Sequence, residues 1–366
     1  MLNAASLWLA DGSPELADTV GRFLVVGFEG QERAELERLI LGVRPAGLIF
    51  FKRNYPGTPA RLRALIDFAQ QLAEASLSRS LFIGIDNEGG LVRRLPGPYT
   101  QLPPAAEIAS DLQAIKQLNY QSARELAATG FNFNFAPVLD VATCQGSFMG
   151  SRSFSEDPFL AAECAKACLA ALHSGGLLGA GKHFPGLGTA VLDPHQELPT
   201  ISSGLHRLRA VDLLPFRALM DMPGGLEAIM STHVLYPAFD AEKPATFSAD
   251  IIGLLKGEMG FAGAVLTDDL EMGAVVKNYP MGEAAAAAVE AGHDLALVCR
   301  KASYIKESIE ALAQATRSGR LNTRRIEDAA RRTARLATRL KEIRPPRREL
   351  DGWFAELESA GPAEND

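Results

Sequence analysis

The sequence predicts an α/β fold, a single-domain (β/α)8 barrel of the TIM type. Eight short, mostly apolar runs alternate with longer segments whose apolar residues recur at helical spacing. Strands that helices cover on both faces need no polar alternation, and most of these runs are apolar throughout. Titratable residues follow every run, as in barrel enzymes, which build their sites at the carboxyl ends of the strands. Eight units over about 300 residues fit a closed barrel better than an open doubly wound sheet.

The first four expected strands are short and rich in β-branched or aromatic residues. Residues 22–27, RFLVVG, end in glycine, and residues 47–51, GLIFF, precede a Lys-Arg pair. Residues 81–85, LFIGI, lead into the polar run DNEGG, and residues 131–135 lead into APVLD. Helical spacing of apolar residues predicts the intervening helices. These helices cover 32–41, 61–75 and 106–128.

The last four expected strands end in residues that are able to do chemistry. Residues 178–181 precede KHFPGLG, and residues 228–231 precede His233. Residues 262–266 lead to Thr-Asp-Asp, and residues 294–298 lead to Cys-Arg. The helices expected in this half of the chain cover 159–174, 205–220, 251–259 and 282–291.

We expect one domain, since no linker is rich enough in Pro, Gly or Ser to separate a second. Residues 22–343 form the barrel, including a basic outer helix at 323–343. Residues 1–21 are a polar lead-in with helical tendency, and residues 344–366 are a C-terminal tail that starts with two prolines and ends acidic.

Composition narrows the partners. The net charge is −7 with no long basic block, which argues against nucleic acid. No apolar stretch approaches the roughly 20 residues of a membrane span. Residues 1–30 lack the basic start, apolar run and small-residue cleavage site of a secretory signal, so we expect a cytoplasmic protein. The sequence gives no indication of oligomeric state.

The four cysteines are too few for a disulfide framework in a chain of 366 residues. Cys164 and Cys168 lie four residues apart on one predicted helix face. We expect buried thiols there, because no second Cys/His pair has matching metal-ligand spacing.

The most informative stretch is 182–199, KHFPGLGTAVLDPHQELP. It gathers Lys182, His183, Asp193 and His195 around prolines and glycines at the end of a strand, as a catalytic loop at the mouth of a barrel does. A carboxylate two residues from an imidazole is able to orient and charge it, and such a His acts as acid and base. A surface Asx-turn with a solvated His explains the same two residues equally well.

Asp268 and Asp269 end an apolar strand, where only one of two neighbouring side chains faces the pocket. A carboxylate in this place is a nucleophile, a metal ligand or a helix cap. Four donors on different loops are candidates to hold a hydroxyl-rich substrate together with Asp86. These donors are Arg94, Arg152, Lys182 and His183.

His233 fits a pocket wall or a hydrogen-bonded core position better than a ligand. No His-Glu-x-x-His is present and no His-x-His follows the first strand, so we expect no metal site. No glycine-rich phosphate loop opens a helix after a strand either.

Five ordered motifs make the chain similar to glycoside hydrolase family 3, and within it to the single-domain bacterial β-N-acetylhexosaminidases. The resemblance runs from about residue 22 to about residue 343. The motifs are GIDNEGGLVRRL (84–95), NFAPVLDV (134–141), GSRSF (150–154), KHFPGLG (182–188) with DPH (193–195), and LTDDLEM (266–272).

The resemblance implies a retaining, cofactor-independent glycosidase that removes N-acetylglucosamine from small amino-sugar glycosides, muropeptides in cell-wall recycling. Asp268 matches the family's nucleophile, His195 its acid/base and Asp193 the partner of that His. The sugar-binding positions are matched by Asp86, Arg94, Arg152, Lys182 and His183.

This chain departs from the family pattern at three positions. The family commonly has His where this chain has Leu187, Ser where it has Pro194, and Arg where it has Leu91. Pro194 fixes φ and removes an N–H between Asp193 and His195. These departures bear on the loop, the rate and the exact substrate rather than on the reaction class.

Four other functions stay open at this point. A glycoside phosphorylase uses phosphate in place of water, and a β-glucosidase takes a sugar without the N-acetyl group. A degenerate barrel binds sugar without turnover, although a binder needs no nucleophile and acid/base together. A metal-dependent barrel hydrolase is the fourth.

Overall fold

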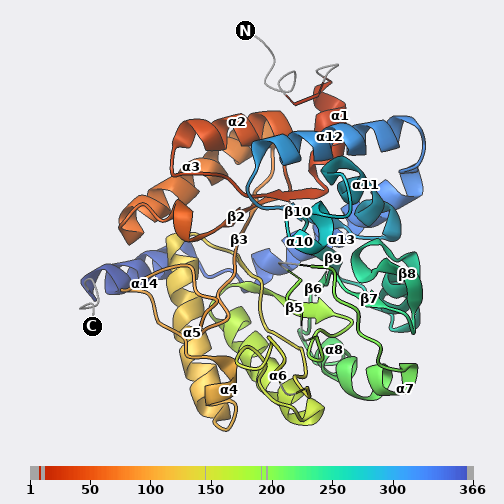
Figure 1. Ribbon diagram of the computed structural model, residues 1–366. Coiled ribbons are helices and arrows are strands. Elements are labelled where there is room, and N and C mark those ends of the chain that lie inside the picture. The colour runs from red at the N-terminus through yellow and green to blue at the C-terminus, as the bar shows by residue number, and fades with distance from the viewer. Residues whose placement is uncertain (1–7, 10–12, 145, 191, 195–196, 361–366) are drawn as a thin grey trace.

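The computed structural model describes residues 8–9, 13–144, 146–190, 192–194 and 197–360. Eight parallel strands close into a barrel in the order β1-β2-β3-β4-β5-β6-β9-β10, and β10 pairs back to β1 (Figure 1). The predicted single-domain barrel is confirmed. Its strands are β1 (Leu24–Val26), β2 (Gly47–Phe50), β3 (Phe82–Ile85), β4 (Phe133–Asn134), β5 (Leu178–Phe184), β6 (Ala228–Ser231), β9 (Ala264–Asp269) and β10 (Leu295–Val298).

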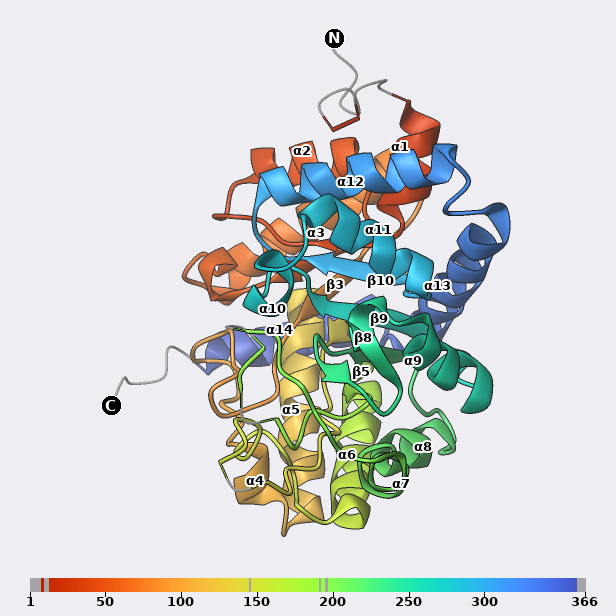
Figure 2. The ribbon, with the colours of Figure 1, turned by 45° about the vertical axis from the view of Figure 1, so that its right-hand side comes forward.

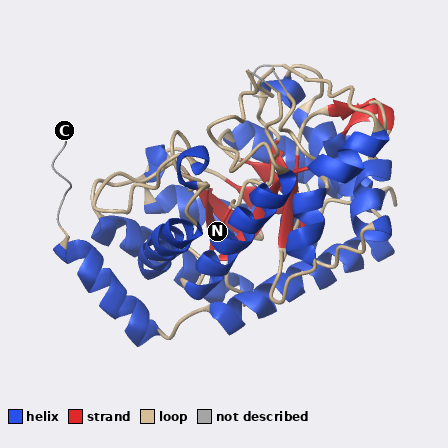
Figure 3. Cartoon of the chain, turned by 90° about the horizontal axis from the view of Figure 1, so that it is seen from below, coloured by secondary structure: helices blue, strands red, loops and turns tan. Residues whose placement is uncertain are grey.

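Helices surround this barrel (Figure 3), and a small antiparallel hairpin, β7 (Leu235–Tyr236) with β8 (Asp240–Pro244), follows β6. The first seven α-helices are α1 (Pro14–Gly21), α2 (Arg33–Val43), α3 (Pro59–Leu77), α4 (Ala105–Ile108), α5 (Leu112–Thr129), α6 (Pro158–Ser174) and α7 (Leu205–Arg207). The other seven are α8 (Leu214–Met220), α9 (Ala249–Gly253), α10 (Gly273–Val276), α11 (Met281–Ala291), α12 (Ala302–Arg317), α13 (Thr323–Ile343) and α14 (Arg347–Ser359). Short 3-10 turns are η2 (Lys52–Asn54) and η4 (Ala245–Phe247), and π turns are η3 (Leu208–Asp212) and η5 (Leu254–Glu258).

Two strands run further than the sequence predicts. β5 was expected to end at residue 181 and continues to Phe184, because Lys182 still pairs with Met230 on β6. β9 was expected to end at residue 266 and continues to Asp269, which pairs with Leu297 on β10. Charged residues extend these strands because their side chains stand at the barrel mouth while the backbone stays in the sheet.

Three predicted helices are divided, and the one expected over 251–259 continues from α9 into η5. The helix expected over 106–128 divides into α4 and α5, because the Asp111 side chain accepts hydrogen bonds from the backbone N–H groups of Gln113 and Ala114 and starts a new helix. The helix expected over 205–220 divides into α7, η3 and α8. Pro215 occupies the first turn of α8, where its missing N–H costs no helical hydrogen bond.

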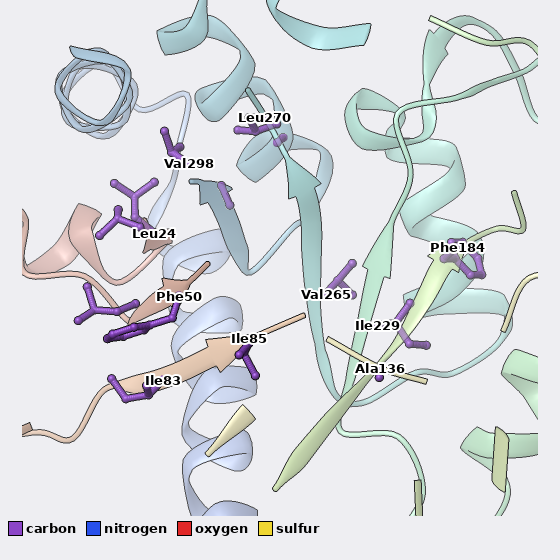
Figure 4. Packing of buried hydrophobic residues seen from close by; sticks show 14 of the residues in the cluster. Leu24, Phe50, Ile83, Ile85, Ala136, Phe184, Ile229, Val265, Leu270 and Val298 are labelled. Atoms are coloured by element: carbon purple, nitrogen blue, oxygen red, sulfur yellow. The ribbon is translucent and has the colours of Figure 1, made fainter. Parts of the chain in front are cut away.

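Neighbouring strand residues face opposite sides of the barrel wall. Leu24, Ile229 and Val265 pack outward against the helices (Figure 4), whereas Met230 and Leu266 belong to a separate interior cluster. This alternation follows from the period of two along a strand. Along the regular part of a strand, the direction of a side chain can therefore be counted from its apolar neighbours. On β5 this count ends at Lys182, after which the register shifts and Phe184 packs in the outer cluster.

The interior is tightly filled. A Cβ added at Gly84 of β3 would lie 2.7 Å from Cε2 of the buried Phe135 ring, so a glycine at this place makes room for the aromatic side chain. At the amino-terminal end of the barrel, Leu336 of α13 joins the interior cluster and covers it.

Both terminal segments carry packed structure. In the lead-in, α1 starts at Ser13, whose hydroxyl accepts a hydrogen bond from the Leu16 N–H. In the segment expected as a tail, α14 packs against α5 and α3 (Figures 1 and 2) and buries Leu350, Phe354 and Leu357. The Arg63 guanidinium of α3 lies 4.4 Å from the centroid of the Phe354 ring.

The prediction of buried thiols on α6 is confirmed. The Cys164 thiol donates to the carbonyl of Ala109, and the Cys168 thiol donates to Oδ1 of Asn119. Within the described ranges, no helix is both long and apolar enough to cross a membrane.

Removing the aromatic anchor of α14 should destabilise the protein. Phe354→Ala leaves a cavity between α14 and the barrel helices, so we expect a loss of about 3 kcal/mol in the free energy of unfolding by denaturant. The matched control is Glu358→Ala, an exposed position on the same helix, which should change it by less than about 0.5 kcal/mol. Equal unfolding curves for the two variants would mean that α14 contributes nothing to the cooperative core.

Candidate active site

Three predicted site residues stand on the interior face of the barrel at its carboxyl end. On β5 the interior residues Leu178 and Ala180 place Lys182 on the same face, and on β9 Ala264 and Leu266 do the same for Asp268. Asp86 follows β3 in the same phase, two residues after Gly84. The period of two thus directs these groups toward a common centre.

Lys182 is the buried centre of a charge network. Its Nζ lies 2.9 Å from Oδ1 of Asp86 and 2.5 Å from Oε1 of Glu88. Arg94 donates to Oδ2 of Asp86 at 3.2 Å, and Arg152 forms a two-pronged pair with Glu88 at 2.8 Å for each bond. The structure therefore brings together four of the five predicted sugar-binding residues around Glu88.

Glu88 is a site residue that sequence reasoning missed. The sequence shows Glu88 in the polar run after β3. Two acidic residues on one loop, Asp86 and Glu88, give no indication that both side chains turn inward. Its side chain is only 5% exposed, and it supplies the carboxylate that Lys182 and Arg152 share. Without it, two buried cations would face each other with one carboxylate.

The ionisation states in this network are fixed. Burial alone raises the pKa of Asp86 and of Glu88. For Asp86, the charges of Lys182 and Arg94 outweigh burial and hold the pKa below its ordinary range. For Glu88, the charges of Lys182 and Arg152 do the same. Burial lowers the pKa of Lys182, and the two carboxylates more than reverse this. Asp86, Glu88, Lys182 and Arg152 are therefore charged at neutral pH, so they form a permanent set of donors and acceptors.

His183 is held by Asp140, a second residue that sequence reasoning did not assign to the site. Nδ1 of His183 lies 2.7 Å from Oδ2 of Asp140, which also accepts from the His183 backbone N–H. Asp140 Oδ1 accepts from the Leu187 N–H at 2.6 Å. Because a carboxylate accepts, Nδ1 carries the proton, and Nε2 faces Oδ2 of Asp268 at 3.9 Å.

Asp268 combines partial exposure with a fixed orientation. Its side chain is 20% exposed, and its Oδ1 accepts a hydrogen bond from the backbone N–H of Asp269 at 2.8 Å. Asp269 does not share this position. Its Oδ1 accepts from the Glu271 N–H, and burial raises the pKa of its carboxyl to about 7. Of the two carboxylates, Asp268 is the one that faces His183.

The predicted acid/base pair is only partly described. His195 lies outside the described residues, so its placement stays a prediction. Asp193 is half-buried, and its carbonyl accepts from the Glu197 N–H at 3.3 Å. The carbonyl of the buried Pro194 accepts from the Ala274 N–H at 3.0 Å, which ties the loop to α10. The contact that holds this loop against α10 therefore involves Pro194, one of the three positions at which the chain departs from the family pattern.

Asp212 of η3 lies under the start of the same loop. It is 1% exposed, and in the part of the chain that the structure describes neither carboxyl oxygen has a hydrogen-bond partner. A Cβ at Gly186 would lie 2.6 Å from the Asp212 Cβ, so the backbone of Gly186 (φ +130°) passes directly over it. Burial raises the pKa of Asp212 to about 7, against the opposing charge of Arg207.

His233 is buried and hydrogen-bonded, as a core position requires. Nδ1 lies 2.6 Å from Oγ1 of Thr246, and Nε2 lies 2.9 Å from the carbonyl of Asp269. Among the described residues no three His, Cys, Asp or Glu side chains form a cluster able to hold a metal ion. Independence from metals and cofactors stays a prediction.

An oriented carboxylate beside fixed donors and acceptors at the mouth of a (β/α)8 barrel is the arrangement expected of a barrel glycosidase. The chain belongs to glycoside hydrolase family 3: residues 15–336 match the family's description "Glycosyl hydrolase family 3 N terminal domain". The resemblance that the five motifs indicate is thereby confirmed.

Relatives cover most of the chain. It is 35% identical over 352 residues to "Beta-hexosaminidase" of Alkalilimnicola ehrlichii, covering 92% of this chain and 98% of the relative. It is 37% identical over 277 residues to "Beta-hexosaminidase" of Methylococcus capsulatus, covering 74% of this chain and 80% of that one. Among solved structures, a family 3 β-N-acetylglucosaminidase of Paenibacillus sp. str. FPU-7 is similar with a TM-score of 0.86 and 34% identity, covering 94% of this chain and 68% of that chain.

Neutralising Asp212 should stabilise the fold in a pH-dependent way. Its folded pKa of about 7 lies above the ordinary 3.8, so the folded chain keeps a proton that the unfolded chain releases. Wild-type stability should therefore fall as pH rises from about 4 to about 7, by up to roughly 4 kcal/mol from this group. Asp212→Asn removes this loss, and its advantage in melting temperature should grow over that range.

The control for this experiment is Asp221→Asn, an exposed aspartate at the end of α8. It should leave the difference from wild type nearly constant with pH. A constant difference for Asp212→Asn as well would show that Asp212 ionises in the folded protein as it does in water.

Proposed function

We propose that this protein hydrolyses terminal, non-reducing β-linked N-acetylglucosamine with retention of configuration, from small muropeptide fragments. The names of its relatives, β-hexosaminidases and a β-N-acetylglucosaminidase, support N-acetylglucosamine as the sugar that is released. The observation that carries the reaction type is Asp268, an oriented carboxylate 3.9 Å from His183 and next to a permanent charge network. The muropeptide source and a cytoplasmic location stay predictions that rest on the family resemblance.

Sugar hydroxyls would be held by groups with unused capacity in the network. Arg152 uses Nε and Nη2 on Glu88, which leaves its Nη1 hydrogens to donate to a ligand. His183 presents Nε2 to a ligand, because its Nδ1–H donates to Asp140. Asp86 accepts and Lys182 donates. Paired donors and acceptors of this kind recognise neighbouring hydroxyl groups.

In the first step Asp268 attacks the anomeric carbon as that carbon's bond to the leaving oxygen breaks. The Asp269 N–H supports the ionised form of Asp268, and Arg152 is close enough to interact with its charge. The leaving oxygen takes a proton from the His195 imidazolium, whose charged form Asp193 favours. The product is a glycosyl-enzyme with inverted configuration at that carbon.

In the second step neutral His195 takes a proton from water, whose oxygen attacks the same carbon. The bond to Asp268 breaks, and the second inversion gives net retention. An imidazole serves both steps because its ordinary pKa lies near neutrality. His195 ends the cycle protonated and ready for the next leaving group.

Turnover of 4-nitrophenyl N-acetyl-β-D-glucosaminide tests both roles. We expect Asp268→Ala to lower kcat/KM by about 10⁴-fold or more, because the covalent step is lost. His195→Ala should lower steady-state turnover by about 10²- to 10⁴-fold and show a nitrophenol burst. Nitrophenolate leaves without a proton, whereas water still needs a base. Sodium azide, an anionic nucleophile that needs no base, should then speed turnover of His195→Ala.

Glu197→Gln, an exposed position on the same loop, is the control and should stay near wild type. Full activity of Asp268→Ala would show that another group is the nucleophile. Full activity of His195→Ala without a burst would remove the acid/base assignment.

The same assay separates the alternatives. A rate that rises with inorganic phosphate and yields a sugar 1-phosphate would identify a phosphorylase. A neutral imidazole is compatible with that reaction, because it does not repel the phosphate anion. Preference for the 4-nitrophenyl β-glucoside would identify a β-glucosidase, and sugar binding without turnover a binding protein. Loss of activity with a chelator would revive a metal-dependent mechanism.

A further inference from the structure

The nucleophile's orientation depends on a backbone turn at the end of β9. Asp268 Oδ1 is held by the N–H of Asp269, and the Asp269 carbonyl accepts from the Met272 N–H at 3.0 Å. Asp269 Oδ1 accepts from the Glu271 N–H at 2.9 Å. These bonds lie within one short segment of chain and shape the turn. On one side β10 also holds it, because the Leu270 N–H donates to the Leu297 carbonyl at 3.0 Å.

His233 holds that turn from the side of β6, the strand next to β9 in the barrel. It follows β6, which pairs with β9, and its ring is fully buried. Nε2 meets the Asp269 carbonyl at 2.9 Å, and a carbonyl only accepts, so Nε2 carries a proton. The other ring nitrogen lies 2.6 Å from Oγ1 of Thr246, whose hydroxyl also lies 3.0 Å from the Thr232 carbonyl. The imidazole is thus anchored at both ends.

We propose that His233 is a positioning residue for the nucleophile: by holding the Asp269 carbonyl it restrains the backbone of residue 269, whose N–H, in the preceding peptide unit, orients Asp268. This inference rests on the proposed role of Asp268. His233 itself touches no reacting atom. A displacement of the reacting carboxylate by about 1 Å is enough to lower the rate by about 100-fold, so a buried clamp one residue away has a kinetic effect.

Two substitutions separate the two ends of the imidazole. The side-chain amide of Gln reaches as far as Nε2 and is able to donate to the Asp269 carbonyl. The amide of Asn reaches only as far as Nδ1, so it meets Thr246 and leaves the carbonyl without this donor. The two variants are otherwise similar in polarity and hydrogen-bonding groups.

We expect His233→Gln to stay within a few-fold of wild type and His233→Asn to lose about 10- to 100-fold in kcat, with KM changed by less than about twofold. Equal kcat for the Asn and Gln variants would overturn the proposal. So would a loss that appears only as lower thermal stability, with kcat of the folded fraction unchanged.

A second measurement needs no substrate. The ¹H–¹⁵N signal of the Asp269 amide should move further from its wild-type position in His233→Asn than in His233→Gln, because only the Asn variant leaves the Asp269 carbonyl without its donor. Among the described residues, the ionisable groups near Asp268 are His183 from β5, Arg152 from the 150–154 segment and Asp269 on its own strand. They are the same in both variants.

An inactive wild-type protein would count against the proposed function alone, since the NMR comparison still decides the positioning role. Identical Asp269 amide signals in the two variants would overturn that role even in an active enzyme.

Discussion

Every strand of a closed parallel barrel has to bury both of its faces. Helices cover the outer face and side chains of the other strands fill the inside, so the strand bodies carry apolar or small residues such as Ile229 and Met230. Polar side chains are confined to the strand ends, where the interior face meets solvent. Asp86, Lys182 and Asp268 are the interior positions that come next in phase on their strands, and the site is a consequence of that spacing.

A buried cation at such a place is costly unless carboxylates surround it. Lys182 has Asp86 and Glu88 within hydrogen-bond distance, and Arg152 from another loop forms a second ion pair with Glu88. The sum is close to neutral, and each side chain is held by a charged neighbour rather than by packing alone. In the proposed mechanism, the groups that bind the sugar therefore keep their charge, and the pH dependence of turnover comes from the groups that transfer protons.

Sequence reasoning located the strands and the residues at their ends because apolar runs and helical spacing are local signals. It assigned Asp268 rather than Asp269 only through resemblance, and the alternation on β9 supplies the physical reason. The sequence did not predict the roles of Glu88 and Asp140, because each depends on a distant partner. The partner of Glu88 is Lys182, 94 residues away, and the partner of Asp140 is His183, 43 residues away. The docking of α14 escaped for a similar reason, since its apolar stripe needs α3 and α5 to bury it.

The hydrogen bond between the Pro194 carbonyl and the Ala274 N–H gives the two halves of the proposed chemistry a common foundation. Pro194 precedes the predicted acid/base by one residue, and α10 begins four residues after the nucleophile's strand ends. A displacement of α10 would therefore move the Pro194 carbonyl with it, whereas Asp268 stays on β9, which pairs with β6 and β10. Substitutions around α10 would change how the loop at Pro194 lies against the strand that carries the proposed nucleophile.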